Sequence, residues 1–502
     1  MRPLPGTFAR PGLWMMLLCA LVVLGPGLHG GYWLAEQGFA PAWNAAGPGI
    51  GSGDETLWQA TGPWALIPAQ MLMRAGLDPV AAVKWQMLLS LLGSGVAVHF
   101  WLQRRLGDRA AAVAGVATLT APLLLMATYT RGNPTELLLV ALFALALAGA
   151  GMAARGRRWP GSVLAVAALL WLPFVQAGIA LVALLLVVLY VLLVEQSWLV
   201  ALSAAVVGGA ALMLRWLTAL GAFNLPGAES PAISLYGVLR AAPVAGEPAQ
   251  LGLVILVLAG AALFAAVGLG FGENWARRLL FFGLGASGFL LLWALPLAAP
   301  LRQLLGAASW TNDPWQPLLL AVPLLGAAAG LSLTFWEGLD EAPLWAAVLV
   351  VLSLAAAPFL RPHYTAVAAP DQPMALLGEN QVAVLAAGVT REPGSAQATL
   401  HMTWQVLTPV AANVNLFLHA LADEDTAQVL AQLDSQPIAD RPATTWSAGE
   451  IFEATWVLDL PPDAPKRLLY HAGFYDWRDG ARLPVRRLID SSTDDKLVFH
   501  DE

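Results

Sequence analysis

Three carboxylates in the first third of the chain could do chemistry. Asp54 and Glu55 are adjacent in a glycine-rich stretch, and Glu36 follows the aromatic pair Tyr32-Trp33. Adjacent carboxylates can hold a divalent cation through oxygen ligands, or deprotonate an acceptor hydroxyl as a general base. We therefore take Asp54, Glu55 and Glu36 as candidate catalytic residues. The alternative is that they have no catalytic role: Asp54 and Glu55 belong to a solvent-exposed loop, and Glu36 to the solvent-exposed face of a helix.

Arginines form the second candidate group. Arg131 and Glu136 lie in the stretch Tyr129–Glu136, where Pro134 begins a helix and Glu136 falls in its first turn, so it suits the helix dipole. Because the planar guanidinium grips phosphate oxygens, we expect a lipid-phosphate site with Arg131 at its centre and with Tyr129 and Glu136 in support. The alternative is a structural Arg131–Glu136 ion pair. Three more arginines are candidates for the phosphate site: Arg215, Arg240 and Arg302.

Other kinds of site are excluded by residue type. The single cysteine, Cys19, permits neither an intramolecular disulfide nor a thiolate metal site. No histidine lies between His99 and His363, so we expect no histidine-based metal site in the central region. We assign no metal ligands, and a divalent cation at the carboxylates is the one cofactor considered. The acidic balance, with a net charge of −7, argues against a nucleic-acid partner.

Most of these candidate residues belong to a part of the chain whose composition predicts membrane helices. The chain is 58% hydrophobic and only 12% charged. Residues 1–360 carry a net charge of +2, whereas residues 361–502 carry −9. The first part has too few charges to face water, so a single soluble enzyme is excluded. We predict a transmembrane domain over 1–360, a linker over 361–380 and a soluble domain over 381–502.

Eleven apolar stretches are long enough to be candidate membrane spans. The stretch 160–194 is open, because it reads either as two spans joined at Gln176 or as one long helix. We interpret the first span as an uncleaved anchor, and Trp64–Met73 as an interfacial helix. The eleven stretches are 13–29, 79–101, 110–128, 134–153, 160–175, 177–194, 197–219, 250–271, 279–298, 315–335 and 343–360.

Arginine distribution predicts the orientation. With the N-terminus in the cytoplasm, ten arginines fall on the cytoplasmic side and four on the other, in agreement with the positive-inside rule. This predicts a multi-pass plasma-membrane protein with an extracytoplasmic C-terminal domain. Three segments, 30–78, 221–249 and 299–314, are then the outer loops long enough to carry a site.

The C-terminal part has the pattern of β-strands. Leu400–Val406 alternates apolar and polar residues, and Asp479-Gly480 marks a tight turn. Short strands without helices between them predict an immunoglobulin-like β-sandwich. We expect Trp404 and Trp477 to belong to its core rather than to a sugar-binding surface.

Several of these residues together resemble a known family. The stretch Tyr129–Glu136 resembles the Tyr-x-Arg-Gly-x-x-x-Glu motif of bacterial membrane proteins related to GT-C-type glycosyltransferases, and Gly38–Asn44 is similar to their Gly-x-x-Pro-x-Trp stretch. The C-terminal part, with Trp404, Thr445–Glu450 and Gly473–Asp476, resembles a sandwich appended to such proteins.

The resemblance implies sugar transfer from a polyprenyl-phosphate donor on the outer face, with a first-loop carboxylate as base or metal ligand. The chain departs from the family at two places. Directly after the first span, Gly27–Gly31 lacks the usual Asp, and near the fifth span Pro173–Ala177 stands where the family shows a Thr-His-Asn-like stretch. A non-catalytic membrane subunit that binds partner proteins in a larger complex is therefore the alternative function. Ion-coupled transport is disfavoured, because ionisable residues are rare within the spans.

Overall fold

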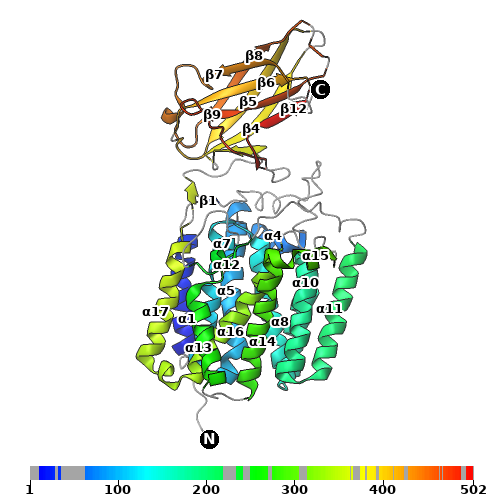
Figure 1. Cartoon of the computed structure of the whole chain (residues 1–502), viewed down its shortest axis with the longest axis vertical. Helices are drawn as coiled ribbons and strands as arrows, with labels where there is room; N and C mark the ends of the chain where they lie inside the picture. The colour runs from blue at the N-terminus through cyan, green and yellow to red at the C-terminus, as the bar shows by residue number, and fades with distance from the viewer. Residues whose placement is uncertain are drawn as a thin grey trace. The chain divides into compact units, whose positions relative to one another are not determined.

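The computed structural model contains a helical unit within residues 1–362, and a β unit that comprises residues 363–502 together with strand β1 (Figure 1). Each is described by itself. The residues described are 11–28, 32–34, 63–77, 79–218, 233–240, 249–268, 274–304, 314–361, 363–365, 373–378, 381–391, 395–410, 412–422, 428–462, 464–465, 467–487 and 493–500.

Each of the eleven apolar stretches is helical over most of its described residues. The long helices are α1 (Pro11–Leu28), α5 (Pro79–Leu106), α6 (Asp108–Leu119), α7 (Pro122–Tyr129), α8 (Pro134–Ala154), α9 (Arg158–Val175), α10 (Ala177–Tyr190), α11 (Trp198–Thr218), α13 (Leu253–Gly268), α14 (Asn274–Ala294), α16 (Ala321–Phe335) and α17 (Ala342–Ala356). Among the described residues, eight helices are long and apolar enough to cross a membrane, and α6 with α7, bent by 45°, make a ninth. Trp159–Val175 and Leu253–Gly268 are shorter apolar helices, so the count of eleven stays a prediction.

The stretch 160–194 consists of two helices. Gln176 lies between α9 and α10 with extended backbone, φ −159° and ψ 105°, which ends the first helix and starts the second. Pro173 lies in the last turn of α9. After Tyr190 the chain makes one π-helical turn, η2 (Val191–Glu195).

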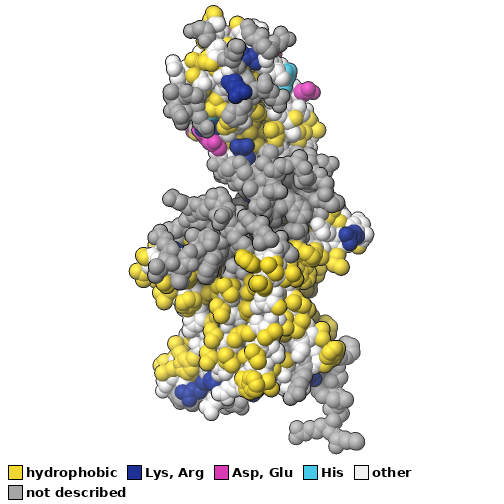
Figure 2. Space-filling model, turned by 90° about the vertical axis from the view of Figure 1, so that its right-hand side faces the viewer, with side chains coloured by type: hydrophobic (Ala, Val, Ile, Leu, Met, Phe, Trp, Pro, Cys, Tyr) yellow, Lys and Arg dark blue, Asp and Glu magenta, His cyan; other side chains and the backbone are white. Residues whose placement is uncertain are grey.

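Small residues let the central helices approach closely. Gly326 and Gly330 of α16 face α6: a Cβ at Gly326 would lie 2.3 Å from Thr118 Oγ1, and one at Gly330 would lie 2.7 Å from the Ala110 carbonyl oxygen. A pair of small residues four positions apart is typical of close helix contacts in membranes. On the face drawn in Figure 2, hydrophobic side chains cover most of the described surface of the bundle, as expected for contact with lipid.

The two ends of the bundle differ in charge. Where α5 ends and α6 begins, Arg104, Arg105 and Arg109 lie within a few residues of one another, and Arg155 donates to the Trp101 carbonyl oxygen at the same end. We call this the arginine end. The opposite end, where α7 ends and α8 begins, is the Glu136 end. Arg104, Arg105, Arg109 and Arg155, four of the ten arginines assigned to the cytoplasm, therefore share one end of the bundle.

The segment expected to lie at the interface is helical and docked on the bundle. It forms η1 (Pro63–Leu66) and α4 (Ile67–Arg74). The buried Gln86 of α5 donates to the Ala65 carbonyl oxygen and accepts from the Ala69 N–H. Gln86 therefore forms hydrogen bonds with both η1 and α4.

The β unit contains a sandwich of two antiparallel sheets, which confirms the predicted fold class. One sheet has the strand order β11-β10-β3-β4-β5-β8 and the other β12-β9-β6-β7. The strands are β3 (Ala375–Leu377), β4 (Val382–Thr390), β5 (Gln397–Val406), β6 (Val414–Leu421), β7 (Val429–Ser435), β8 (Ile451–Asp459), β9 (Leu469–Asp476), β10 (Val485–Arg487), β11 (Thr493–Asp494) and β12 (Leu497–His500).

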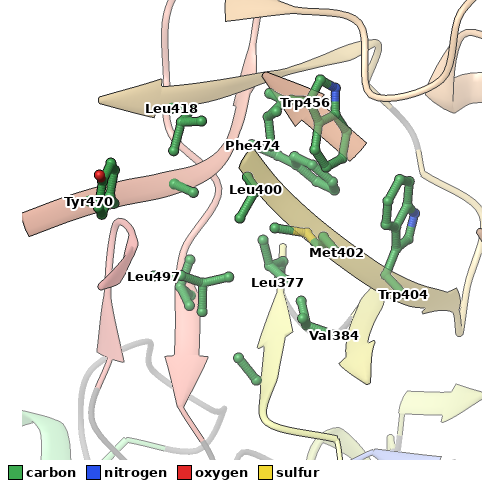
Figure 3. Packing of buried hydrophobic residues seen from close by; sticks show 14 of the residues in the cluster. Leu377, Val384, Leu400, Met402, Trp404, Leu418, Trp456, Tyr470, Phe474 and Leu497 are labelled. Carbon is green, nitrogen blue, oxygen red and sulfur yellow. The ribbon is translucent and has the colours of Figure 1, made fainter. Parts of the chain in front are cut away.

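Both sheets contribute to one core, shown in Figure 3. Trp404 is fully buried there, and its ring lies 5.8 Å from that of Phe474 on the facing sheet. Trp477 is 56% exposed, so the expectation that it belongs to the core is wrong. It directly follows β9, beyond the last position at which strand alternation fixes which side faces inward.

Strands also form within the segment expected to be a linker. β3 joins the six-stranded sheet through β4 and β10, and β2 (His363–Thr365) pairs with β1 (Tyr32–Leu34). The sandwich thus begins at Ala375 rather than at residue 381. A strand of three residues carries too little periodicity to be recognised alone.

Candidate functional site

The stretch that resembles the family motif forms a tight link between α7 and α8 at the Glu136 end. Backbone N–H groups of Arg131 and Asn133 donate to the carbonyl oxygens of Met126 and Ala127, and Gly132 adopts a positive φ of 64°. Asn133 then caps α8, because its side-chain oxygen accepts from the N–H groups of Thr135 and Glu136. These hydrogen bonds therefore fix the backbone positions from which the side chains of Arg131 and Glu136 extend.

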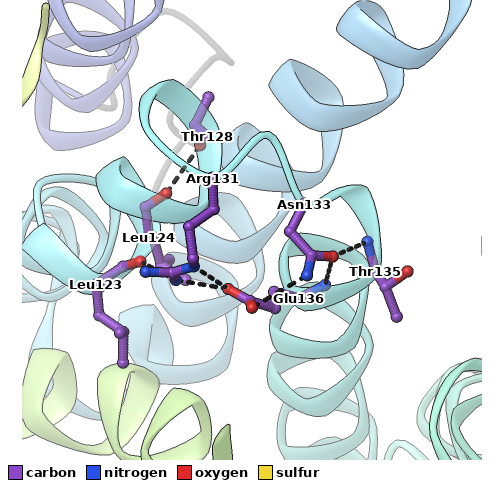
Figure 4. Close-up of polar contacts among 7 residues, drawn as sticks. All are labelled: Leu123, Leu124, Thr128, Arg131, Asn133, Thr135 and Glu136. Carbon is purple, nitrogen blue, oxygen red and sulfur yellow. Dashed lines mark hydrogen bonds and ion pairs between the residues drawn. The ribbon is translucent and has the colours of Figure 1, made fainter. Parts of the chain in front are cut away.

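Arg131 and Glu136 form a buried ion pair, shown in Figure 4. Nη2 and Nε of Arg131 lie 2.6 and 3.2 Å from Oε2 of Glu136, and Asn133 Nδ2 donates to Oε1 at 3.1 Å. Arg131 Nη2 also lies 3.3 Å from the Leu123 carbonyl oxygen. The two side chains are 10% and 3% exposed. The structural ion pair, which the sequence left as an alternative, is therefore present.

Two glutamines and an aromatic ring continue this polar region. The Arg131 guanidinium lies over the ring of Trp315, 4.7 Å from its centroid. The next residue, Gln316, accepts a 2.6 Å hydrogen bond from Gln176, the residue between α9 and α10. Trp315 and Gln316 precede α16, so the ends of five helices, α7, α8, α9, α10 and α16, meet here. The sequence analysis missed Gln316 as a site residue; a polar side chain at the start of an apolar run was the available signal.

Tyr129 makes a second polar contact at the Glu136 end. Its hydroxyl donates to the Val23 carbonyl oxygen of α1 at 2.6 Å, and the side chain is buried. Tyr129 is thus a structural support, because the bond ties the end of α7 to α1.

An apolar groove of about 660 Å³ lies between α10 and α14. It extends from Gly178 of α10 to Leu193 of η2, which at about 1.5 Å per residue is roughly 22 Å, or most of a hydrocarbon core. Trp293 and Pro317 line it toward the Glu136 end. Pro317 directly follows Gln316, so the polar region described above adjoins this end of the α10–α14 groove.

Arg302 lies at the same end of the groove. It belongs to α15 (Ala299–Leu304), and its Nη1 donates to the carbonyl oxygens of Trp293 and Leu295, where α14 ends. A cation is favoured there because the last carbonyls of a helix are otherwise unsatisfied. Since Trp293 lines the groove, Arg302 brings a positive charge to its end.

Of the remaining candidates, two arginines lie among the described residues and three carboxylates do not. Arg215 is half-buried in the last turn of α11, and Arg240 is exposed just after α12 (Leu235–Val238). Asp54, Glu55 and Glu36 lie outside the described residues. Among the described residues, no three His, Cys, Asp or Glu side chains are grouped to hold a metal ion.

No family model matches the chain, and none of the curated proteins matches it. Among solved structures it is similar to ArnT from Cupriavidus metallidurans bound to undecaprenyl phosphate, with 16% identity, a TM-score of 0.43, and coverage of 70% of this chain and 64% of that one. It is also similar to the Archaeoglobus fulgidus oligosaccharyltransferase, with 12% identity, a TM-score of 0.39, and coverage of 70% and 53%. The chain thus spans less than two thirds of the length of either protein.

Proposed function

We propose that this protein binds a polyprenyl-phosphate-linked sugar and transfers the sugar at the Glu136 end of the bundle. The observation that carries the proposal is an apolar groove of near-membrane length with an arginine at one end. An isoprenoid chain is apolar and long, so it matches the groove, and its phosphate is anionic, so it matches Arg302 at the end of the groove. The sequence resemblance to GT-C-type proteins supports the same donor class.

In this proposal the isoprenoid chain lies between α10 and α14, and the phosphate is held by Arg302. Arg131 acts differently from the expectation based on sequence: with Glu136 it forms a neutralised pair beside Trp315 and Gln316. In this proposal Arg131 supports the residues at the end of the groove, and it is not the residue that holds the phosphate. A carboxylate of segment 30–78, Asp54 or Glu55 or Glu36, would deprotonate the acceptor, with or without a divalent cation. We propose that this end and the sandwich are extracytoplasmic.

The test uses two glycines of α14 that are matched except for their position. A Cβ at Gly285, which lines the groove, meets nothing within 4 Å, and the same holds for Gly288, which does not line it. Gly285→Leu should weaken capture of a photoactivatable polyprenyl phosphate about tenfold, because the new side chain fills the groove. Gly288→Leu should bind like the wild type. Equal binding by the two variants would contradict the proposed lipid position.

The alternative function, a non-catalytic subunit, is favoured by one observation: Arg131 of the motif is already paired with Glu136. Such a protein would still bind the lipid in the groove. The two functions differ in turnover, so purified protein supplied with a polyprenyl-phosphate sugar and an acceptor should release free polyprenyl phosphate only if it is an enzyme. Binding without release would favour the subunit.

A further inference from the structure

Unsatisfied hydrogen-bond donors gather at the arginine end of α14. Trp275 is 6% exposed and its buried Nε1 has no acceptor among the described residues; the same is true of Nε of Arg278. The two residues are three positions apart on α14 and therefore share a face of the helix. Buried donors without acceptors are rare in native proteins and call for a ligand or an ordered water.

A charged network adjoins this face. Arg105 lies over the Trp275 ring, 4.9 Å from its centroid, and its Nη2 is 3.7 Å from Glu195 Oε2. Glu195 also lies 3.6 Å from Arg155 Nε and accepts a 2.5 Å hydrogen bond from Tyr190. Glu195 ends the π-helical turn η2, and such turns are frequent at functional sites.

The network has an excess of positive charge. Two guanidinium groups, those of Arg105 and Arg155, lie within 4 Å of one carboxylate, that of Glu195. A third arginine, Arg278, follows Trp275 by about one turn of α14. Nη1 of Arg155 is buried and, like the two α14 donors, has no acceptor within the described part of the chain. An anion would satisfy the donors and balance the charge at once.

Lipid-facing apolar side chains flank the cluster. Leu193, two residues before Glu195, is 56% exposed, and Phe281, one turn after Arg278, is 48% exposed. Both line the arginine end of the α10–α14 groove. The anion would therefore sit where a phospholipid headgroup lies, with acyl chains against Leu193 and Phe281.

We infer that the arginine end of α14 binds the phosphate of an anionic phospholipid, in the leaflet opposite to the proposed transfer site. Trp275 Nε1, Arg278 and Arg105 donate to the headgroup, and Arg155 completes its surroundings through Glu195. Anionic lipids attract basic residues near the membrane surface, at about 1 kcal/mol each. This inference does not depend on the proposed sugar transfer, because it concerns the other end of the bundle.

The experiment measures lipid binding by the delipidated full-length protein in detergent. Native mass spectrometry counts bound lipid, and thermal unfolding is followed with phosphatidylglycerol, phosphatidylcholine or inorganic phosphate. Phosphatidylglycerol should raise the melting temperature more than the other two, because a ligand that binds only the folded state stabilises it. Equal stabilisation by phosphatidylcholine would overturn the proposal. Equal stabilisation by inorganic phosphate would overturn the lipid as the source of the anion.

Three variants locate the site. Arg278→Ala should weaken phosphatidylglycerol binding about tenfold, and Trp275→Phe, which removes only the N–H, about fivefold. The control is Arg157→Ala, an exposed arginine at the same end of the bundle. If Arg157→Ala weakens binding as much as Arg278→Ala does, the effect is general surface charge and the site is wrong. Trp275→Phe keeps the packing, so it tests the site even if Arg278→Ala fails to fold.

Discussion

Arg131 illustrates how a residue can carry a motif and yet be engaged within the protein. A buried guanidinium requires a partner, and Glu136 supplies it from the first turn of the next helix. Asn133 then occupies the other carboxylate oxygen while it caps α8. A turn, a helix cap and an ion pair therefore come from one short stretch, and the face of the Arg131 guanidinium lies over the ring of Trp315.

Removing either partner of this pair should be costly. We expect Arg131→Ala and Glu136→Ala each to lower the stability by about 3–5 kcal/mol, because each leaves a buried charge without its partner. The double variant should be less destabilised than the sum of the two, as expected for coupled residues. A double-mutant cycle on thermal unfolding measures this coupling, with the exposed neighbour Thr130→Ala as control. Additive effects would show that the two side chains do not depend on each other.

At the level of elements, the bundle is organised around helices whose small residues allow close approach. α16 is almost entirely buried and packs against α6 through Gly326 and Gly330. α10 and α14, by contrast, leave a groove between them, lined by leucine and phenylalanine side chains. The bundle is thus tightly packed around α16 and leaves a groove between α10 and α14.

The close contact between α6 and α16 predicts that an added methyl group at Gly326 lowers stability, whereas one at an open glycine does not. Gly326→Ala should destabilise the protein by about 1–3 kcal/mol, since its Cβ would meet Thr118 Oγ1 at 2.3 Å and the Ala114 carbonyl oxygen at 2.9 Å. Gly260→Ala in α13 meets nothing within 4 Å and should be neutral or slightly stabilising, because alanine favours helix. Thermal unfolding in detergent compares the two. An equal loss for both would mean that the α6–α16 contact does not limit stability.

In the whole molecule, the membrane unit and the sandwich have separate cores. The sandwich core joins Trp404 of one sheet to Phe474 of the other. β3 is part of this unit, because it pairs with both β4 and β10. The sandwich therefore needs residues that composition alone assigned to a linker.

This gives a prediction about the boundary. Residues 373–502 expressed alone should fold and unfold cooperatively, whereas residues 381–502 should be clearly less stable, because loss of β3 separates β4 from β10 and uncovers the core around Val384. Circular dichroism melting and dispersion of amide resonances compare the two fragments. If the shorter fragment melts at the same temperature, β3 contributes nothing to the fold.

Much of the fold follows from local sequence. Apolar runs of sufficient length determined the helices, and alternation determined that Trp404 faces the sandwich core. The position of Glu136 in the first turn of α8 followed from Pro134, and the turn at Asp479-Gly480 from its residue types; there Gly480 has a φ of 73°. These features depend on residues close together in the chain, so the sequence alone contains their cause.

The surroundings of the site depend on how distant parts of the chain pack together. Gln176 and Gln316 are 140 residues apart, and their hydrogen bond depends on how α9, α10 and α16 pack. The α10–α14 groove and the position of Arg302 at its end likewise arise from which helix faces fail to meet, which no single helix encodes. The sequence alone is compatible with two roles for Arg131, phosphate binding and an ion pair with Glu136. The packing of α7 against α8, which buries both side chains, selected the pair, because a buried charge must have a partner.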